Sequence, residues 1–148
     1  MEVREIMTRE PAYCMPDTKL RDVARLMVDQ DCGEIPVVDS KSSKKPVGVV
    51  TDRDITTRVV AAGKNPADLK ARDCMSTPVV SITPETDVES CCQVLEQNQV
   101  RRVPVVDQRG QLCGIVSQAD IAKHASGRDT AEVVRSISRP AGTTARTR

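Results

Sequence analysis

Apolar residues in segments 19–30 and 88–99 recur at intervals of three and four, which is the spacing of one face of an α-helix. The residues on these faces are Leu20, Val23, Ala24 and Met27 in the first segment and Val88, Cys91, Cys92 and Leu95 in the second. Acidic and hydroxyl residues stand directly before each segment, where they favour the start of a helix. The pattern therefore predicts two amphipathic helices whose apolar faces pack against a core.

Short β-prone runs lie on both sides of each predicted helix. "AYCM" (12–15) and "VVSI" (79–82) come before the helices and are followed closely by a proline. "IPVVD" and "VPVVD" come after them, and turn-rich loops separate these runs from "VGVV" and "CGIV". Two β-prone runs joined by such a loop predict an antiparallel hairpin. A further helix is predicted to begin at Thr51 in one half and at Ser117 in the other, so that each half has the order β-α-β-β-α.

The two halves repeat one another in sequence as well as in pattern. "EIPVVD" at 34–39 matches "RVPVVD" at 102–107, and "GVVTDRDI" at 48–55 matches "GIVSQADI" at 114–121. The difference in length between the halves falls in a polar loop, where insertions are tolerated. Such an internal repeat indicates two copies of one structural unit.

These observations predict an α/β (α+β) fold in which two pseudo-symmetric β-α-β-β-α repeats pack together through their sheets. We place the first repeat at residues 1–68 and the second at residues 69–127. Residues 128–148 form a C-terminal extension that ends in a small, polar and basic run, and we expect this extension to be partly disordered.

Composition and charge exclude several classes of function. The chain has 148 residues, no Phe or Trp and a single Tyr, so it offers no aromatic platform on which nucleic-acid bases could stack. Its formal net charge is +1, which gives no overall field toward DNA or an anionic membrane. No apolar run is long enough to span a membrane, and the first residues do not resemble a signal peptide. We therefore expect a soluble, cytoplasmic protein with no membrane partner.

Catalytic and metal chemistry have few residues to build on. His124 is the only histidine, which leaves almost nothing for a Ser-His-Asp system or a multi-histidine metal site. The six cysteines contain no Cys-x-x-Cys pair, and we interpret them as buried, reduced thiols, with a disulfide or metal framework as the alternative. The two acids of "TDRD" diverge at a helix start and lack a third acidic ligand. We predict no enzymatic activity and no structural metal.

Three features, each present twice, resemble a cystathionine-β-synthase (CBS) domain pair, also called a Bateman module. They are the proline-led first strand, the "P-V-V-D" strand and the strand-to-helix junction with the pattern G-h-h-[ST]-x-x-D-I, where h is apolar. The resemblance covers about residues 3 to 125. It implies a regulatory protein that binds an adenosine-containing ligand in clefts between the two copies. AMP, ADP or ATP is the first expectation, and NAD or S-adenosylmethionine is the alternative.

The doubled junction has a chemistry that suits such a ligand. A strand that ends at Thr51 or Ser117 and turns into a helix leaves unpaired N–H groups and the positive end of the helix dipole for a phosphate. Asp54 and Asp120 follow one helical turn later on the same side, where a carboxylate can accept hydrogen bonds from both hydroxyls of a ribose. The alternative is that the hydroxyls only cap the helices while the aspartates complement the dipole.

The two copies differ in charge just before their "P-V-V" strands. In the CBS family, the residues at this place line the cleft whose hydroxyl and aspartate come from the other copy. Arg101 and Arg102 of the second copy, with Arg53, are therefore expected to bind phosphate in the cleft of Thr51 and Asp54. The alternative is that the two adjacent arginines belong to a solvated turn.

The first copy carries Glu34 where the second carries an arginine. We expect Glu34 to face the cleft of Ser117 and Asp120, which would then be weak, empty or suited to a less anionic ligand. The family geometry also implies that the backbone of Val79, in the first strand of the second copy, meets the adenine edge near Asp54.

These interpretations predict a regulatory module that senses an adenine nucleotide and acts on a separate effector protein. One alternative is a CBS-type scaffold that dimerises or docks without a ligand, and the last is nucleic-acid binding through the basic tail. We also expect a homodimer, because the helix faces that carry Ile55, Val59, Val60 and Ile121 are too apolar for an exposed surface.

Overall fold

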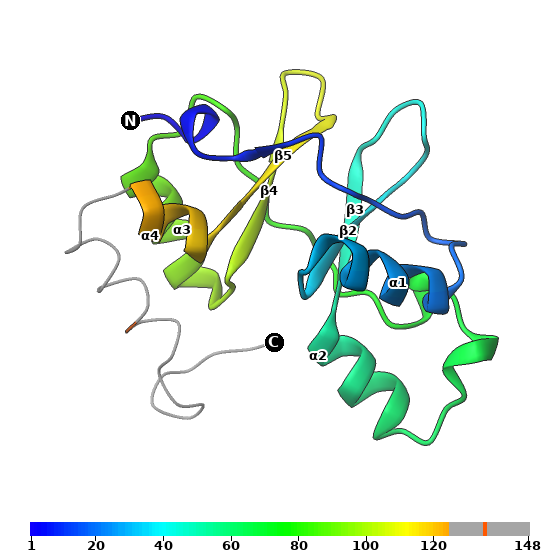
Figure 1. The fold of residues 1–148 in the computed structure, drawn as a ribbon. Coiled ribbons are helices and arrows are strands. Elements are labelled where there is room, and N and C mark those ends of the chain that lie inside the picture. Colours follow the sequence, from blue (N-terminus) through cyan, green and yellow to red (C-terminus); the bar gives the residue numbers. More distant parts are fainter. Residues whose placement is uncertain (125–134, 136–148) are drawn as a thin grey trace.

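Two similar halves lie side by side in the computed structural model, which describes residues 1–124 and Arg135 (Figure 1). Each half combines a two-stranded hairpin with helices, which confirms the predicted mixed fold class and its two repeats. The elements of the first repeat are α1 (Leu20–Gln30), β2 (Glu34–Val38), β3 (Pro46–Thr51) and α2 (Asp52–Ile55), and those of the second are α3 (Val88–Asn98), β4 (Arg102–Val106), β5 (Leu112–Ser117) and α4 (Gln118–His124).

Shorter elements complete the chain. They are the 3₁₀ turns η1 (Val3–Glu5), η3 (Pro66–Asp68) and η4 (Ala71–Asp73), the strand β1 (Thr8–Arg9) and the π-helical turn η2 (Thr56–Val60), which continues α2. The predicted extension of residues 128–148, and any nucleic-acid binding through it, lie outside the described residues except for Arg135.

Both predicted hairpins are present with the same register. β2 pairs antiparallel with β3 so that Glu34 lies opposite Thr51, and β4 pairs antiparallel with β5 so that Arg102 lies opposite Ser117. Each hairpin also has one register irregularity near the end of its first strand. The hairpins therefore bring the start of each "P-V-V" strand next to the hydroxyl residue of its own repeat.

The predicted first strands, at 12–15 and 79–82, are wrong as continuous strands. Each contributes a single parallel bridge, from Cys14 to Val37 and from Ile82 to Val105. The N–H of Cys14 donates to the Pro36 carbonyl, and the next donor on that side would be residue 16. Residue 16 is a proline, as is the corresponding residue 84, and proline has no N–H with which to extend the ladder.

The segments that open the two repeats cross to the opposite repeat, which the sequence analysis did not predict. β1 pairs antiparallel with β5, with Thr8 opposite Ile115. Ser76, in the corresponding position of the second repeat, forms an antiparallel bridge with Val49 of β3. We call residues 3–9 the first crossing segment and residues 71–76 the second crossing segment. Figure 1 shows the first of them passing from the α3–α4 side toward α1.

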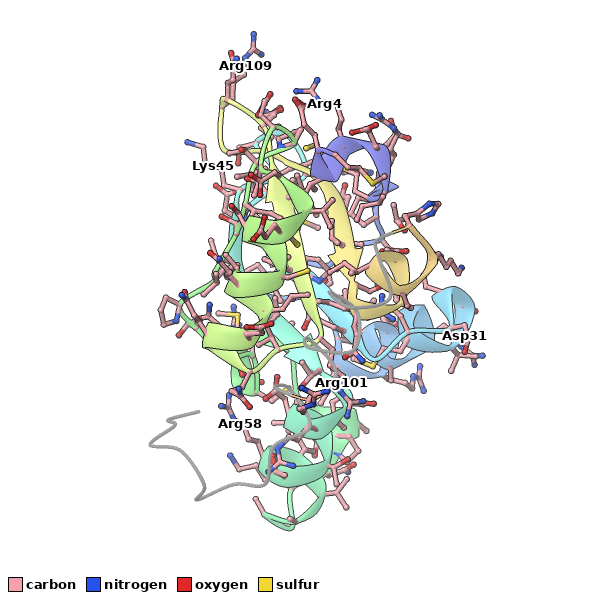
Figure 2. The ribbon with its side chains drawn as sticks, turned by 90° about the vertical axis from the view of Figure 1, so that its left-hand side faces the viewer. Arg4, Asp31, Lys45, Arg58, Arg101 and Arg109 are labelled. Carbon is pink, nitrogen blue, oxygen red and sulfur yellow. The ribbon has the colours of Figure 1, made fainter. Side chains whose placement is uncertain are left out.

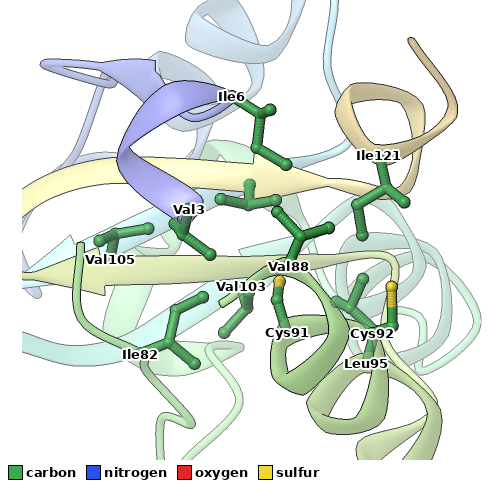
Figure 3. Close-up of a cluster of buried hydrophobic side chains, with 11 residues drawn as sticks. Val3, Ile6, Ile82, Val88, Cys91, Cys92, Leu95, Val103, Val105 and Ile121 are labelled. Carbon is green, nitrogen blue, oxygen red and sulfur yellow. The ribbon is translucent and has the colours of Figure 1, made fainter. Parts of the chain in front are cut away.

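Two separate hydrophobic cores result, and each includes apolar residues from a crossing segment. Val3 and Ile6 are buried among residues of the second repeat, and Figure 3 shows them packed over Val88 and Ile121. Ala71 and Cys74 are buried in the core of the first repeat, with Leu20, Val23, Ile35, Val37, Val50 and Val59. The predicted apolar helix faces are confirmed as packing surfaces of these cores.

All six cysteines are free thiols, but only four of them are buried as interpreted, because Cys32 and Cys113 are partly exposed. Cys91 and Cys92 are both buried in the second core, so the adjacent pair is core packing. Burial raises the pKa of Cys14 to about 12 and that of Cys91 also to about 12, with smaller contributions from the neighbouring thiols Cys74 and Cys92. Both thiols are therefore poor nucleophiles near neutral pH.

The helix faces on which the homodimer prediction depended are mostly internal. Val59 and Ile121 are fully buried in the cores of their own repeats, and Ile55 is partly buried. Val60 alone of the four is exposed, at 62%. These residues therefore give no continuous apolar face, and the homodimer stays a prediction without this support. Within residues 1–124, no helix has the length and apolar character needed to cross a lipid bilayer.

Candidate functional site

Each strand-to-helix junction is closed by a reciprocal pair of hydrogen bonds. The Asp54 N–H donates to Thr51 Oγ1 over 3.0 Å, and the Thr51 N–H donates to Asp54 Oδ2 over 2.9 Å. In the second repeat the corresponding distances between Ser117 and Asp120 are 3.1 Å and 2.9 Å. We call Thr51 and Asp54 the first junction and Ser117 and Asp120 the second junction. The capping role, one of two alternatives from the sequence, is thus present in both repeats.

The predicted set of unpaired N–H groups is wrong for the start of α2. The Asp52 N–H donates to the Gly33 carbonyl, the Arg53 N–H donates to Asp52 Oδ1, and the Asp54 N–H is used by the cap. The loop before β2 lies close enough to supply the first of these acceptors because Glu34 pairs with Thr51. A phosphate at the first junction would therefore depend on side chains instead of these amides.

Asp54 is buried, at 7% exposure, and has partners beyond its cap. Ser76 Oγ donates to Asp54 Oδ1 over 3.0 Å, and Arg58 Nε lies 3.8 Å from the same oxygen. Arg58 Nη1 also donates to the carbonyls of Cys74 and Met75, at 3.1 Å and 3.0 Å. The first junction is therefore tied to the second crossing segment through one arginine and one serine.

Sequence reasoning missed both of these residues. Arg58 stands four positions after Asp54 on a predicted helix, and this spacing of opposite charges was a signal that could have identified it. Ser76 had no such signal, because only the crossing of the chain brings it to β3.

Asp120 has simpler surroundings. It is partly exposed, and within residues 1–124 its only hydrogen-bond partner is Ser117. Thr8 and His124 occupy the positions that correspond to Ser76 and Arg58, and neither forms a hydrogen bond or ion pair with Asp120. The two junctions are alike as helix caps but differ in what covers the carboxylate.

Glu34 lies among charges of both repeats. Its Oε2 atom is buried and has no hydrogen-bond partner among the described residues, although the residue as a whole is only partly buried. Burial raises the pKa of this carboxyl to about 7, the Arg102 guanidinium opposes the shift, and the Asp54 carboxylate adds to it. The expectation that Glu34 faces Asp120 needs correction, because the charges that act on it are Arg102 and Asp54. Its pairing opposite Thr51 places it beside the first junction.

Three arginines predicted to bind phosphate carry guanidinium groups without a hydrogen bond or ion pair to residues 1–124. Arg53 and Arg101 are exposed, and Arg102 is half-buried and electrostatically coupled to Glu34. Figure 2 shows Arg101 at the level of α2, at the opposite end of the molecule from Arg109. Arg53 belongs to the start of α2, whereas Arg102 pairs opposite Ser117 of its own repeat, so the place of Arg101 and Arg102 in the cleft of Asp54 stays a prediction.

Val79 lies in an irregular extended segment and not in a strand. It is partly buried, and its backbone N–H and carbonyl make no hydrogen bond with residues 1–124. Both groups are therefore free to bind the edge of a planar ring, and the contact with adenine stays a prediction. In the same described range no group of three His, Cys, Asp or Glu side chains is arranged to hold a metal ion.

Comparison with known proteins agrees with this arrangement. A family model for the CBS domain matches residues 3–61 and, a second time, residues 71–127. The chain belongs to the CBS domain family. One CBS relative, the uncharacterized protein MK0525 of Methanopyrus kandleri, is 33% identical over 121 residues. The match covers 82% of this chain but only 61% of that protein, so this chain spans less than two thirds of that relative.

Two further relatives have informative descriptions. Hypoxic response protein 1 of Mycobacterium tuberculosis is 30% identical over 137 residues, which is 93% of this chain and 94% of that protein. A crystal structure of Hypoxic Response Protein I with two coordinated zinc ions matches with a TM-score of 0.76, covering 85% of this chain and 100% of that one. A crystal structure of CBSX2 in complex with AMP matches with a TM-score of 0.71 at 25% identity, covering 84% and 95% of the two chains.

Proposed function

We propose that this CBS pair is a regulatory module that binds an adenosine-containing ligand between its repeats and thereby modulates a separate effector protein. AMP, ADP or ATP is the first choice, and NAD or S-adenosylmethionine is the alternative. The observation that carries the proposal is the buried Asp54 carboxylate at the start of α2, next in sequence to the exposed Arg53, whose guanidinium has no partner among the described residues. The AMP complex of the structural relative CBSX2 supports an adenosine ligand.

The residues have distinct roles in this proposal. Asp54 and Asp120 accept hydrogen bonds from the ribose hydroxyls at their own junctions, and Thr51 and Ser117 hold them in position. The backbone of Val79 meets the adenine edge.

The phosphates bind to arginine side chains, because the amides at the start of α2 are already used. Arg102 is half-buried and Arg53 and Arg101 are exposed, so an anionic ligand can form charge-assisted hydrogen bonds with them. An ionised Glu34 attracts Arg102 without forming an ion pair with it, and protonation of Glu34 would remove this competing attraction.

Regulation follows from differential affinity. A ligand that contacts both repeats binds best to the conformation in which the repeats are closest. It can shift the conformational equilibrium only by the difference between its binding free energies for the closed and open conformations. CBS pairs are generally regulatory and not catalytic, and here the effector is proposed to be a separate protein. A homodimer remains part of the proposal.

A ligand-independent scaffold is the second candidate. The cap bonds and the Ser76 bond already use part of the hydrogen-bonding capacity of Asp54 without any ligand. In that case the aspartates only stabilise the junctions.

Calorimetric titration of the full chain with AMP, ATP, NAD and S-adenosylmethionine separates the two candidates. We expect at least one of them to bind, and Asp54→Ala to weaken binding at the first junction by about one to two decades. Arg102→Ala should weaken ATP more than adenosine, because only ATP carries phosphates. Denaturant unfolding of each variant is the control for a loss of stability from the lost cap. Absence of binding by all four ligands would favour the scaffold.

A further inference from the structure

The two junction aspartates are oriented in the same way but covered differently. Each carboxylate accepts the N–H of the residue three positions earlier over 2.9 Å, and each backbone N–H donates back to that residue's hydroxyl. These reciprocal bonds are sufficient to hold the side chain in place, as the second junction shows. Among the described residues, this orientation is thus reached at Asp120 without the additional partners that Asp54 has.

Ser76 and Arg58 are these additional partners, and both act on Asp54 Oδ1. The serine hydroxyl donates to this oxygen over 3.0 Å, which is one of the interactions a ribose hydroxyl would make. The Arg58 guanidinium, 3.8 Å away, is held in place by its bonds to the Cys74 and Met75 carbonyls. A group from the protein itself thus takes up part of the acceptor capacity that a ribose would use.

The second junction provides an internal comparison. Thr8 replaces Ser76 and His124 replaces Arg58, and among residues 1–124 neither bonds to Asp120. Asp120 is also partly exposed, whereas Asp54 is 7% exposed. The difference between the repeats therefore lies at two named positions and not in the caps.

We propose that Ser76 and Arg58 form a latch on Asp54, with which a ribose competes for binding at the first junction, and that no residue of 1–124 forms such a latch at the second junction. This inference rests on the proposed function, since it assumes that Asp54 receives a ribose. The apparent affinity at the first junction is then the intrinsic affinity multiplied by the fraction of molecules in which the latch is open.

The latch also connects ligand binding to the contact between repeats. Ser76 belongs to the second crossing segment, and its backbone exchanges two hydrogen bonds with Val49, at 2.8 Å and 3.1 Å. The same segment supplies the carbonyls that hold Arg58. When a ribose displaces Ser76, the hydrogen bond from Ser76 to Asp54 is lost, and the second crossing segment is held less firmly to the first repeat. Ligand binding could in this way change how the two repeats pack against each other.

The test measures AMP affinity by calorimetry in full-length chains that carry Asp120→Ala, so that only the first junction can bind. Adding Ser76→Ala should tighten AMP binding by about 3- to 10-fold, because the ribose no longer competes with the serine hydroxyl. Ser76→Thr keeps the hydroxyl and should bind as the Asp120→Ala chain does. Thr8→Ala is the matched control at the corresponding position of the second repeat, and we expect no change from it.

Unchanged or weaker AMP binding in the Ser76→Ala chain, while the Asp120→Ala chain binds AMP, would overturn the latch and leave the proposed function intact. If Asp120→Ala alone abolishes AMP binding, the latch predicts that adding Ser76→Ala restores it. Failure of Ser76→Ala to restore binding would overturn the latch. If the unmodified chain binds no adenosine compound, the proposed function fails and the latch with it.

Arg58→Gln in the same Asp120→Ala chain provides a second variant in case Ser76→Ala does not fold, as judged by circular dichroism. Adenosine is the probe for this variant, because it has no phosphate that could depend on the arginine charge. Tighter adenosine binding supports the latch, and equal or weaker binding contradicts it.

Discussion

Glu34 is the residue whose chemistry depends most on its place in the fold. Its Oε2 atom is buried without a hydrogen-bond donor among the described residues, and the nearby Asp54 carboxylate further disfavours its charge. Arg102 provides the opposing attraction, but the two side chains are not within ion-pair distance of each other. Burial therefore outweighs the arginine, and the pKa of Glu34 rises to about 7.

This shift predicts a pH dependence of stability that Glu34→Gln should remove. Because the pKa of Glu34 rises from 4.5 to about 7, the folded chain holds this proton more tightly than the unfolded chain. The associated stability is fully present below about pH 4.5 and is lost as the pH rises through about 7. Between about pH 5 and about pH 8, the unmodified chain should lose roughly 2 kcal/mol more free energy of unfolding than the Gln variant.

Urea unfolding at the two pH values measures this difference. Glu89→Gln, at an exposed position, is the control for removing a carboxylate elsewhere. Parallel pH profiles of the unmodified chain and Glu34→Gln would show that Glu34 is ionised throughout, contrary to its burial.

At the scale of the elements, the repeated glycines of the "GVVT" and "GIVS" strands explain how the crossing segments approach. A Cβ atom on Gly48 would lie 2.8 Å from Met75 Sδ and 3.1 Å from the Ser76 carbonyl oxygen. On Gly114 it would lie 2.6 Å from Met7 Sδ and 3.1 Å from the Thr8 carbonyl oxygen. The absence of a side chain at these positions is what lets the crossing segments pack against β3 and β5.

Alanine at either glycine should therefore destabilise the chain. The methionine side chain can move away, but the neighbouring carbonyl is backbone and hydrogen-bonded to the strand. We expect Gly48→Ala and Gly114→Ala each to lower the free energy of unfolding by about 1–3 kcal/mol, as measured by denaturant titration. Because the two environments are nearly equivalent, the two variants serve as controls for each other. An unchanged midpoint for both would mean that the crossing segments do not pack closely on these strands.

At the scale of the whole molecule, neither core is complete within its own repeat. The first core includes Ala71 and Cys74, and the second includes Val3 and Ile6. Residues 1–68 and 69–127, prepared separately, would each lack core residues and one strand pairing. We expect each half to lack a cooperative denaturant transition by circular dichroism, and an equimolar mixture to recover one.

The full chain, unfolded under the same conditions, is the control for this experiment. A cooperative transition of either half alone, with the midpoint of the full chain, would show that the crossing segments contribute little to stability. The outcome also tests whether the predicted boundary between residues 68 and 69 separates independent units.

The sequence alone determined the features that depend on neighbours along the chain. Helical spacing identified the α1 and α3 faces, turn-rich loops identified both hairpins, and the repeated junction led to the CBS family. The caps at Thr51 and Ser117 were foreseen as one of two alternatives, because a cap needs only residues three positions apart.

Tertiary structure alone decided what depends on residues far apart in the chain. No local sequence pattern predicts three such features. They are the crossing of residues 3–9 and 71–76, the contact of Ser76 with Asp54, and the burial of Glu34 near Arg102. For the same reason the sequence alone assigned Val59 and Ile121 to an exposed apolar surface. Each is buried in a core that includes residues of a crossing segment. Periodicity along a chain shows which face of an element is apolar, but only the packed fold shows which partner covers that face.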